Sequence, residues 1–544
     1  MSLGTLSPEI INNIVSYTIE APAYDIEEWC SQLPLLGLCR KWRAVAAPLV
    51  FSQLYISTVS GTRQSEPGKC ANEDYYIDEG DVVELDSNIS LVASGGYHSA
   101  VRQLDIRVES NEDTLDILNS TCQLLGSRSL TWKGIAWLRT SFMLDELAIE
   151  ADKEGDFSRL DSRATQLCDA FARLLPNITH IDTLGTSAST PCCLFMSKVV
   201  DVYSQQLRHL DSSFPLLLMS PQFSDRLEHL GVEFDEAIEE QFPYVYPQSL
   251  RYLSLGNISS KSIWHFFYDE THAAGIEFSR LRQLSMAFNP AVEKESSDED
   301  FVSARLFGKL SFPALSRLSF SLCPSVHGVL AQASFASSLK TLQIICPMGG
   351  VVTLSDVLFD SLTRGALAEH VAGSNLFKDF SRTPNFLLTA SSFAKSVSFH
   401  VDSVTEISDD AVIKWENLTQ LSIDSRISSA KLLSLISGLP QLATLDAANV
   451  AIGGSAPGVP SLDPTTNHDW PSMPPFDTRL RNLRLWFQTA NNASDLEAAL
   501  VKVLLARIPT LQTIQVPAGA YGLDAFINEH AAQLPHLRRF CTSP

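Results

Sequence analysis

The sequence predicts an α/β solenoid in which short parallel strands alternate with helical returns. The main observation is a recurring apolar phrase of the form L-x-x-L-x-φ, found for example at residues 207–212, 227–232 and 250–255. A second observation is that the segments after these phrases have helical periodicity. Because a phrase repeated at intervals of about 20–50 residues is typical of stacked supersecondary units, we expect a repeat protein with a long binding surface.

The phrases extend through most of the chain. They begin at residues 101, 144, 178, 207, 227, 250, 281, 315, 339, 418, 442, 480, 511 and 537, and Ala394 begins a degenerate copy in the widest gap. The spacing matches leucine-rich repeats of roughly 20–29 residues with surface insertions. The leucines alternate into the core, so we expect parallel strands on the concave face and helices on the convex face.

One complete cycle illustrates the expected unit. Residues 418–423 form the predicted strand, and residues 428–436 form the amphipathic return. Gly438 ends this helix, and the next strand begins at residue 442. Strand, helix and strand make one parallel crossover.

The residues between the leucines form the candidate binding face. They are His209, Asp211, His229, Glu233, Tyr252, Ser254, Gln283, Ser285, Arg317, Gln343, Gln420, Asp424, Asp446, Asn482, Arg484 and Trp486. Tyr252 and Trp486 are the expected anchors, because aromatic residues dominate the energetics of protein interfaces. Arg317, Asn482 and Arg484 complete the set of predicted substrate-binding residues. A solvated sheet face without a specific role is the alternative.

The N-terminal residues follow a different pattern. Ser7 is a predicted N-cap and Pro8 a predicted first helical residue, followed by an apolar helical face. A second helical phrase starts near residue 33, and Pro48 is expected to stop it. Three short helices in about fifty residues bury little core alone, so a partner or the adjacent repeats should cover part of them.

The order Leu6, Pro8-Glu9-Ile10, Ile14, Leu36, Cys39-Arg-Lys-Trp42-Arg, Pro48-Leu49 and Leu54 resembles an F-box. The common form of that motif reads L-P-x-E-I-x-x-x-I, then V-C-[KR]-x-W-[KR], then P-x-[LW]. The resemblance covers residues 5–56. This chain departs from it by the extra Ser7 and by an insertion around residues 23–32.

The resemblance implies a substrate receptor of a cullin-RING ubiquitin ligase. The F-box would bind a Skp-type adaptor and, through it, a cullin, while the repeats hold the protein to be ubiquitinated. By position, the implied adaptor-binding residues are Leu6, Pro8, Ile10, Ile14, Leu36, Cys39, Trp42 and Leu49. The alternative for Trp42 and Ile10 is a role in the small core of this segment.

The expected organisation has three parts. Residues 1–56 form the F-box-like helical domain, 57–100 a linker with short strands, and 101–544 the irregular leucine-rich-repeat solenoid. An acidic loop at 289–300 and a Pro/Gly-rich loop at 453–478 interrupt the repeats.

Composition argues against several partners. The formal net charge is −22, which repels nucleic-acid backbones and anionic lipid. There is no long apolar run or signal-like start, so we expect a cytoplasmic or nuclear protein. The ten cysteines contain no C-x-x-C pair, and no metal or cofactor is predicted.

No catalytic motif is present in the sequence. We find no G-x-S-x-G, P-loop, G-x-G-x-x-G or H-E-x-x-H. Asp409-Asp410 could form an acid–base pair but equally suit the start of a helix-like turn, where carboxylates favour the helix dipole. The seven-residue spacing of His265 and His272 fits two exposed positions as well as a pair of ligands. The sequence therefore predicts a non-catalytic subunit, with a leucine-rich-repeat scaffold lacking ubiquitin-ligase coupling as the alternative.

Overall fold

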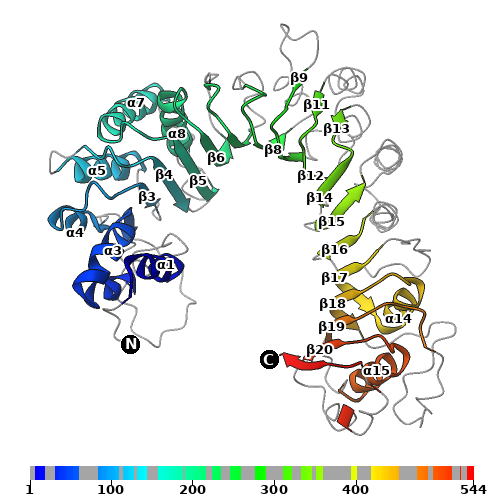
Figure 1. The fold of residues 1–544 in the computed structure, drawn as a ribbon. Helices are drawn as coiled ribbons and strands as arrows, with labels where there is room; N and C mark the ends of the chain where they lie inside the picture. Colours follow the sequence, from blue (N-terminus) through cyan, green and yellow to red (C-terminus); the bar gives the residue numbers. More distant parts are fainter. Residues whose placement is uncertain are drawn as a thin grey trace, which may run out of the picture. The chain divides into compact units, whose positions relative to one another are not determined.

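A computed structural model gives the fold as two compact units, Met1–Phe266 (the N-terminal unit) and Phe267–Pro544 (the C-terminal unit) (Figure 1). The structure describes residues 6–18, 31–59, 84–108, 114–127, 131–143, 157–187, 190–215, 223–234, 246–258, 276–288, 310–321, 333–345, 351–358, 394–400, 418–451, 475–487, 494–517, 527–528, 534 and 536–543. Within these residues, no helix combines the length and apolar character needed to cross a membrane.

Three helices open the N-terminal unit, and we refer to them as the helical segment. They are α1 (Pro8–Thr18), the 3₁₀ helix η2 (Leu33–Gly37) and α3 (Arg40–Val50). As predicted, Ser7 begins α1: its hydroxyl accepts a hydrogen bond from the backbone N–H of Ile10 at 3.4 Å. The expectation that Pro48 ends the second helix is wrong. Pro48 lies inside α3, which continues for two further residues because the Phe51 N–H still bonds to the Ala47 carbonyl at 2.9 Å.

The sheet of the N-terminal unit is parallel except at one edge. Its strands lie in the order β2-β1-β3-β4-β5-β6-β7-β8, and only β2 pairs in the antiparallel sense. The bounds are β1 (Gln53–Val59), β2 (Glu84–Ser87), β3 (Gln103–Val108), β4 (Trp137–Met143), β5 (His180–Ser187), β6 (His209–Pro215), β7 (His229–Glu233) and β8 (Tyr252–Ile258). The second apolar residue of each phrase, Ile181 on β5 and leucine on the other strands, lies in one buried register row that runs from Leu54 on β1 to Leu253 on β8.

Asn88 forms hydrogen bonds with the part of β1 that does not pair with β2. It is 1% exposed, and it follows β2 immediately before the short helix α4 (Ile89–Ser94). Its side chain accepts a hydrogen bond from the Tyr55 N–H at 2.9 Å and donates one to the Gln53 carbonyl at 3.1 Å. Pairing of β1 with β2 begins at Ile56, so the backbone groups of Gln53 and Tyr55 on that side need a side-chain partner when they are buried.

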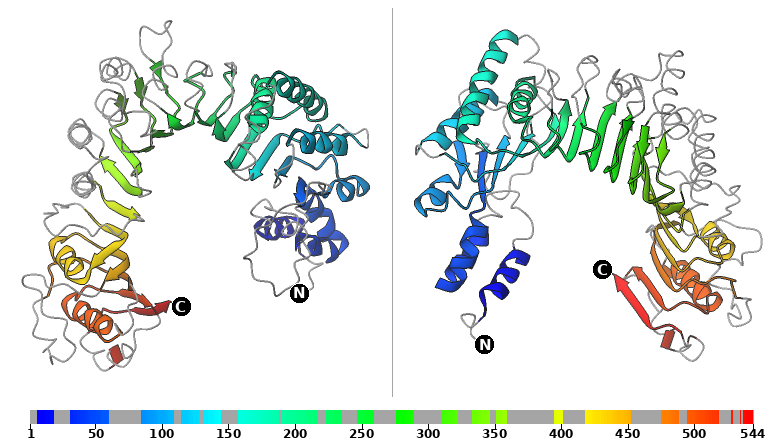
Figure 2. Two further views of the ribbon diagram at one scale, coloured as in Figure 1. Left: turned by 180° about the vertical axis from the view of Figure 1, so that it is seen from behind. Right: turned by 45° about the horizontal axis from the view of Figure 1, so that its top comes forward.

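Helices cover one face of the N-terminal sheet (Figures 1 and 2). They are α5 (Thr114–Gly126), α7 (Phe157–Leu174) and α8 (Thr190–Tyr203). Phe171 of α7 and Phe195 of α8 pack edge to face, with ring centroids 5.3 Å apart. Thr140, on the buried face of β4, lies 3.8 Å from the sulfur of Met196 on α8. The opposite face of the strands is therefore the one that carries the polar side chains.

The C-terminal unit has the same organisation. Its main sheet has the order β10-β12-β14-β15-β16-β17-β18-β19-β20-β21, in which β15 is antiparallel to both neighbours and the other pairs are parallel. The bounds are β10 (Gln283–Phe288), β12 (Arg317–Ser321), β14 (Ser338–Ile345), β15 (Val351–Leu358), β16 (Ser396–His400), β17 (Gln420–Ser428), β18 (Thr444–Ala451), β19 (Asn482–Phe487), β20 (Thr513–Pro517) and β21 (Arg539–Ser543). A second sheet joins β9 (Ile276–Glu277), β11 (Leu310–Phe312) and β13 (Ser334–Phe335). The helices α14 (Ser429–Gly438) and α15 (Ser494–Arg507) provide returns.

Strands occur at nearly all of the predicted phrases. The cycle predicted from residue 418 is confirmed as β17, α14 and β18, with the Ser428 hydroxyl accepting from the Lys431 N–H at 3.3 Å. The degenerate copy at Ala394 is confirmed as β16. The phrase at 144 lies outside the described residues, and β4, which begins seven residues earlier, was not predicted.

Other expectations meet the structure only in part. β1 begins at Gln53, before the predicted boundary at 56, and pairs with β3 as a member of the main sheet. The predicted linker contains β2 and α4. The antiparallel strand β15 was not predicted. Outside the described residues lie the acidic loop 289–300, residues 453–474 of the Pro/Gly-rich loop, and His265, His272, Asp409 and Asp410.

Candidate functional site

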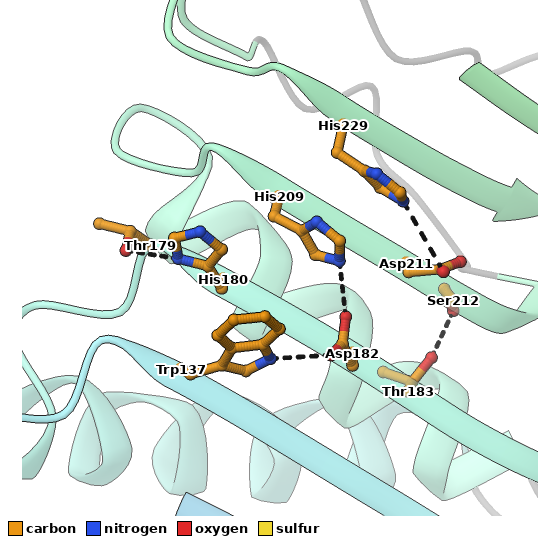
Figure 3. A network of polar contacts seen from close by, with 9 residues as sticks. All are labelled: Trp137, Thr179, His180, Asp182, Thr183, His209, Asp211, Ser212 and His229. Atoms are coloured by element: carbon orange, nitrogen blue, oxygen red, sulfur yellow. Dashed lines mark hydrogen bonds and ion pairs between the residues drawn. The ribbon is translucent and has the colours of Figure 1, made fainter. Parts of the chain in front are cut away.

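Five rings stack across the polar face of the N-terminal sheet, and we call them the ring ladder. They occupy one register position on β4 to β8: Trp137, His180, His209, His229 and Tyr252. The centroid separations are 4.8 Å for the first pair, then 5.7, 3.9 and 3.9 Å. Figure 3 shows the first four rings side by side above the strands.

The repeat itself explains this stacking. Each ring is the residue just before the second apolar position of its phrase, as in Leu207-Arg-His209-Leu210. Adjacent strands are roughly 4.8 Å apart, so flat side chains at equal register on parallel strands meet face to face. Contact between His229 and Tyr252 is nearly parallel, with an interplanar angle of 6°.

A second row, two residues further along each strand, carries charge. We call it the charged row; it consists of Asp105, Arg139, Asp182 and Asp211 on β3 to β6, and its next register position, on β7, is Gly231. Along each strand this row lies on the same face as the ring ladder, because side chains alternate with a period of two. The two rows place carboxylates directly beside imidazoles.

Asp182 links three strands. Its Oδ2 accepts the indole N–H of Trp137 at 2.8 Å, and its Oδ1 accepts His209 Nε2–H at 2.7 Å (Figure 3). Burial opposes ionisation of this carboxyl, but the bonds from His209 and Trp137 outweigh it and lower the pKa of Asp182 below its ordinary value. Asp182 is therefore an ionised acceptor at neutral pH that holds the rings on both sides.

Burial, and then the charge of His209, lower the pKa of His180. Its Nδ1 lies 2.9 Å from the hydroxyl of Thr179. His180 is thus a neutral stacking group at neutral pH, and its ring separates Trp137 from His209 along the ladder.

Asp211 and His229 form a second acid–imidazole pair. Asp211 Oδ2 lies 3.7 Å from His229 Nε2, and that nitrogen is buried without a hydrogen-bond partner among the described residues. Gly231 is the register partner of Asp211, and a Cβ at Gly231 would overlap the carboxylate oxygen Oδ1. Glycine at this position leaves the space that the Asp211 side chain occupies.

A smaller polar cluster lies in the C-terminal unit. Arg484 of β19 lies over the Trp486 ring at 5.1 Å, and its guanidinium is 3.6 Å from Asp446 of β18. Asn482 donates a hydrogen bond to the Thr444 hydroxyl at 3.4 Å. Three of the five predicted substrate-binding residues therefore share strand β19.

The other two predicted residues lie apart from this cluster. Arg317 is exposed on β12, and Tyr252 belongs to the ring ladder of the N-terminal unit. Sequence reasoning missed Trp137, His180 and Asp182. The signal was present: Ile178-Thr-His180-Ile181 is a repeat phrase, and Ile135-Ala-Trp137-Leu138 is another in which isoleucine replaces the first leucine.

The structure also separates the residues implied to bind an adaptor. Pro8, Ile10 and Ile14 are exposed, whereas Leu6, Leu36, Cys39 and Leu49 are partly buried against the core of the helical segment. Trp42 is only 3% exposed and forms that core with Ile11, Val15 and Ala46. In the free chain, Trp42 therefore packs inside the segment and does not contribute to its surface.

The ring ladder and the charged row offer flat stacking surfaces, carboxylates and imidazole nitrogens on one face. Such groups can contact a protein surface, exchange protons or bind a metal ion. Comparison of the sequence with protein-family models and with curated proteins gave no match.

Proposed function

We propose that the chain is the substrate-recognition subunit of an SCF-type cullin-RING ubiquitin ligase, acting in the cytoplasm or nucleus. The helical segment is the F-box that binds a Skp-type adaptor. The sheet of the N-terminal unit and the main sheet of the C-terminal unit are the leucine-rich-repeat solenoid that binds the target protein. The subunit brings the target to the ligase and performs no chemistry itself.

The observation that carries this proposal is the exposed apolar surface of the helical segment. Ile10, Ile14 and Leu38 are 48%, 40% and 47% exposed, although they adjoin a packed core. Ile10 and Ile14 are one helical turn apart, so they lie on the same face of α1. An apolar face of this kind on a small helical unit is typical of a protein interface.

The ring ladder and the charged row, together the polar rows, also support the proposal. A parallel sheet whose exposed positions repeat in register presents a long, ordered surface. The ring ladder contains aromatic residues, and Trp486 with Arg484 adds an aromatic–arginine pair, the residue types that dominate binding energy at interfaces.

The test is co-purification with a Skp-type adaptor. We expect the wild-type chain to bind, and the double variant Ile10→Asp, Ile14→Asp to lose about tenfold or more in affinity, because the adaptor would then have to bury two charged groups in place of two aliphatic ones. Leu91→Asp is the matched control: Leu91 is 53% exposed on α4, outside the helical segment. An adaptor that ignores the wild-type chain, or binds both variants equally, contradicts the proposal.

A leucine-rich-repeat scaffold without ligase coupling is the second candidate. The polar rows support it independently, because they do not involve the helical segment. This candidate predicts that the Ile10→Asp, Ile14→Asp variant retains its protein partners and that the wild-type chain binds no adaptor.

A further inference from the structure

We propose that His209, Asp211 and His229 form a binding site for one divalent transition-metal ion of the zinc class. The inference does not depend on the proposed function. It rests on the geometry of β6 and β7 in the middle of the ring ladder.

The three side chains lie close together on one face of the sheet. His209 and His229 are register partners on adjacent parallel strands, and Asp211 lies two residues after His209 on the same face. One ligand atom from each residue lies within 4.8 Å of the other two. Bonds from one Zn²⁺ to its ligand atoms are about 2.0–2.2 Å long, so these atoms lie roughly 3.3 Å apart. The rings of His209 and His229 are stacked at 3.9 Å, and binding would turn both rings out of this stack toward the ion.

One nitrogen of the site is available to bind a metal ion. His229 Nε2 is buried and has no hydrogen-bond partner among the described residues, and the nearest carboxylate oxygen, on Asp211, is 3.7 Å away. That separation is too long for a hydrogen bond. A metal ion between the two groups would satisfy the nitrogen and the carboxylate together.

Neighbouring residues position two of the proposed ligands, His209 and Asp211. Asp182 fixes the orientation of the His209 ring by accepting Nε2–H at 2.7 Å, and Trp137 in turn holds Asp182. A carboxylate bonded to a ligating histidine is the usual support of a metal site. Gly231 leaves the space into which the Asp211 carboxylate turns, because any Cβ there would overlap it.

The donor set determines the class of ion. Two imidazoles and one carboxylate suit Zn²⁺, Co²⁺, Ni²⁺ or Cu²⁺, whereas Ca²⁺ and Mg²⁺ prefer oxygen ligands alone. All three side chains are partly solvent-accessible, so water or a donor from a bound protein would complete the coordination.

Calorimetric titration of the full, chelator-treated chain with Zn²⁺ tests the proposal. We expect one site in the wild-type chain and a loss of about tenfold or more in affinity in His229→Gln and in Asp211→Asn. Gly231→Ala, which displaces the carboxylate while keeping all three ligands, should also weaken binding. His180→Gln is the matched control, since His180 is in the same ladder but outside the triad.

A Co²⁺ titration identifies the donor atoms. We expect visible d–d absorption without thiolate-to-metal charge transfer, because no cysteine is a member of the site. Thermal unfolding provides an independent measure, since a given concentration of metal should raise the Tm of the wild-type chain more than that of His229→Gln.

Three results would overturn the inference. The first is the absence of stoichiometric Zn²⁺ binding by the wild-type chain. The second is equal affinity in wild type, His229→Gln and Asp211→Asn, and the third is a thiolate signature in the Co²⁺ spectrum. Each would leave the ring ladder as a structure held by stacking and hydrogen bonds alone.

Discussion

Asp105 and Asp182 occupy the same register position on β3 and β5, with Arg139 of β4 between them. The fold nevertheless shifts the pKa values of their two carboxyl groups in opposite directions. Burial raises the pKa of Asp105 to about 6, despite hydrogen bonds from Gln103 and Gln53. The pKa of Asp182 is lowered, because bonds from His209 and Trp137 outweigh its burial. The two acids therefore give the N-terminal sheet opposite dependences on pH.

Asp105→Asn should stabilise the protein at neutral pH. Asp105 is 6% exposed, and its pKa in the folded state is raised to about 6. Its contribution to the free energy of unfolding is therefore most favourable below its pKa in the unfolded chain, about 4, and is lost as the pH rises through about 6. We expect the variant to exceed the wild type in free energy of unfolding by about 1–3 kcal/mol at pH 7 and by less than about 1 kcal/mol at pH 4. Hydrogen exchange in β3 measures this difference. An equal difference at both pH values would show that Asp105 does not titrate in this range.

Asp182→Ala should destabilise the N-terminal sheet. It removes the acceptor for two side-chain N–H groups, at a cost of about 1–3 kcal/mol in the free energy of unfolding at neutral pH. Asp211→Ala is the control, because its side chain is 54% exposed and its contact with His229 is longer, so its cost should be below about 1 kcal/mol. Urea unfolding compares the two variants, and equal costs would refute the bridging role of Asp182.

Gly134→Ala should destabilise by overpacking against backbone. A Cβ at Gly134 would lie 2.5 Å from the Val101 carbonyl oxygen, and we expect a loss of about 1–3 kcal/mol. Gly438→Ala meets no atom within 4 Å at the end of α14 and should leave the Tm unchanged or slightly higher. Differential scanning calorimetry separates the two outcomes, and a stable Gly134→Ala chain would contradict the close approach.

Trp42→Ala should unfold the helical segment even in the absence of an adaptor, because Trp42 stabilises the segment from within. Trp42 lies in the core, and its truncation should cost about 3–5 kcal/mol within the segment. Ile10→Ala, on the exposed face of α1, should cost less than about 0.5 kcal/mol. Limited proteolysis within residues 6–50 measures the difference. Equal resistance of both variants would place Trp42 outside the core.

The strand positions were largely predictable because the second leucine of each phrase is buried. Leu210, Leu230 and Leu253 fall in one register row, as the period of the phrase requires. β4 was missed because Ile135 replaces the leucine that marks other strands, and β15 was missed because residues 351–358 carry no such phrase. Pro48 was expected to end α3, but local propensity does not reveal when surrounding packing lets a helix continue.

The sequence by itself determined the mixed α/β class, the positions of most strands and the polar character of the face that carries His209, His229 and Tyr252. Only the tertiary structure decided which polar residues meet. Trp137 and Asp182 are 45 residues apart in the chain and are hydrogen-bonded because β4 and β5 pair in register. Register depends on how whole strands pack against their neighbours, and segments of variable length separate those strands. The sequence interval between two residues therefore cannot determine their separation in space.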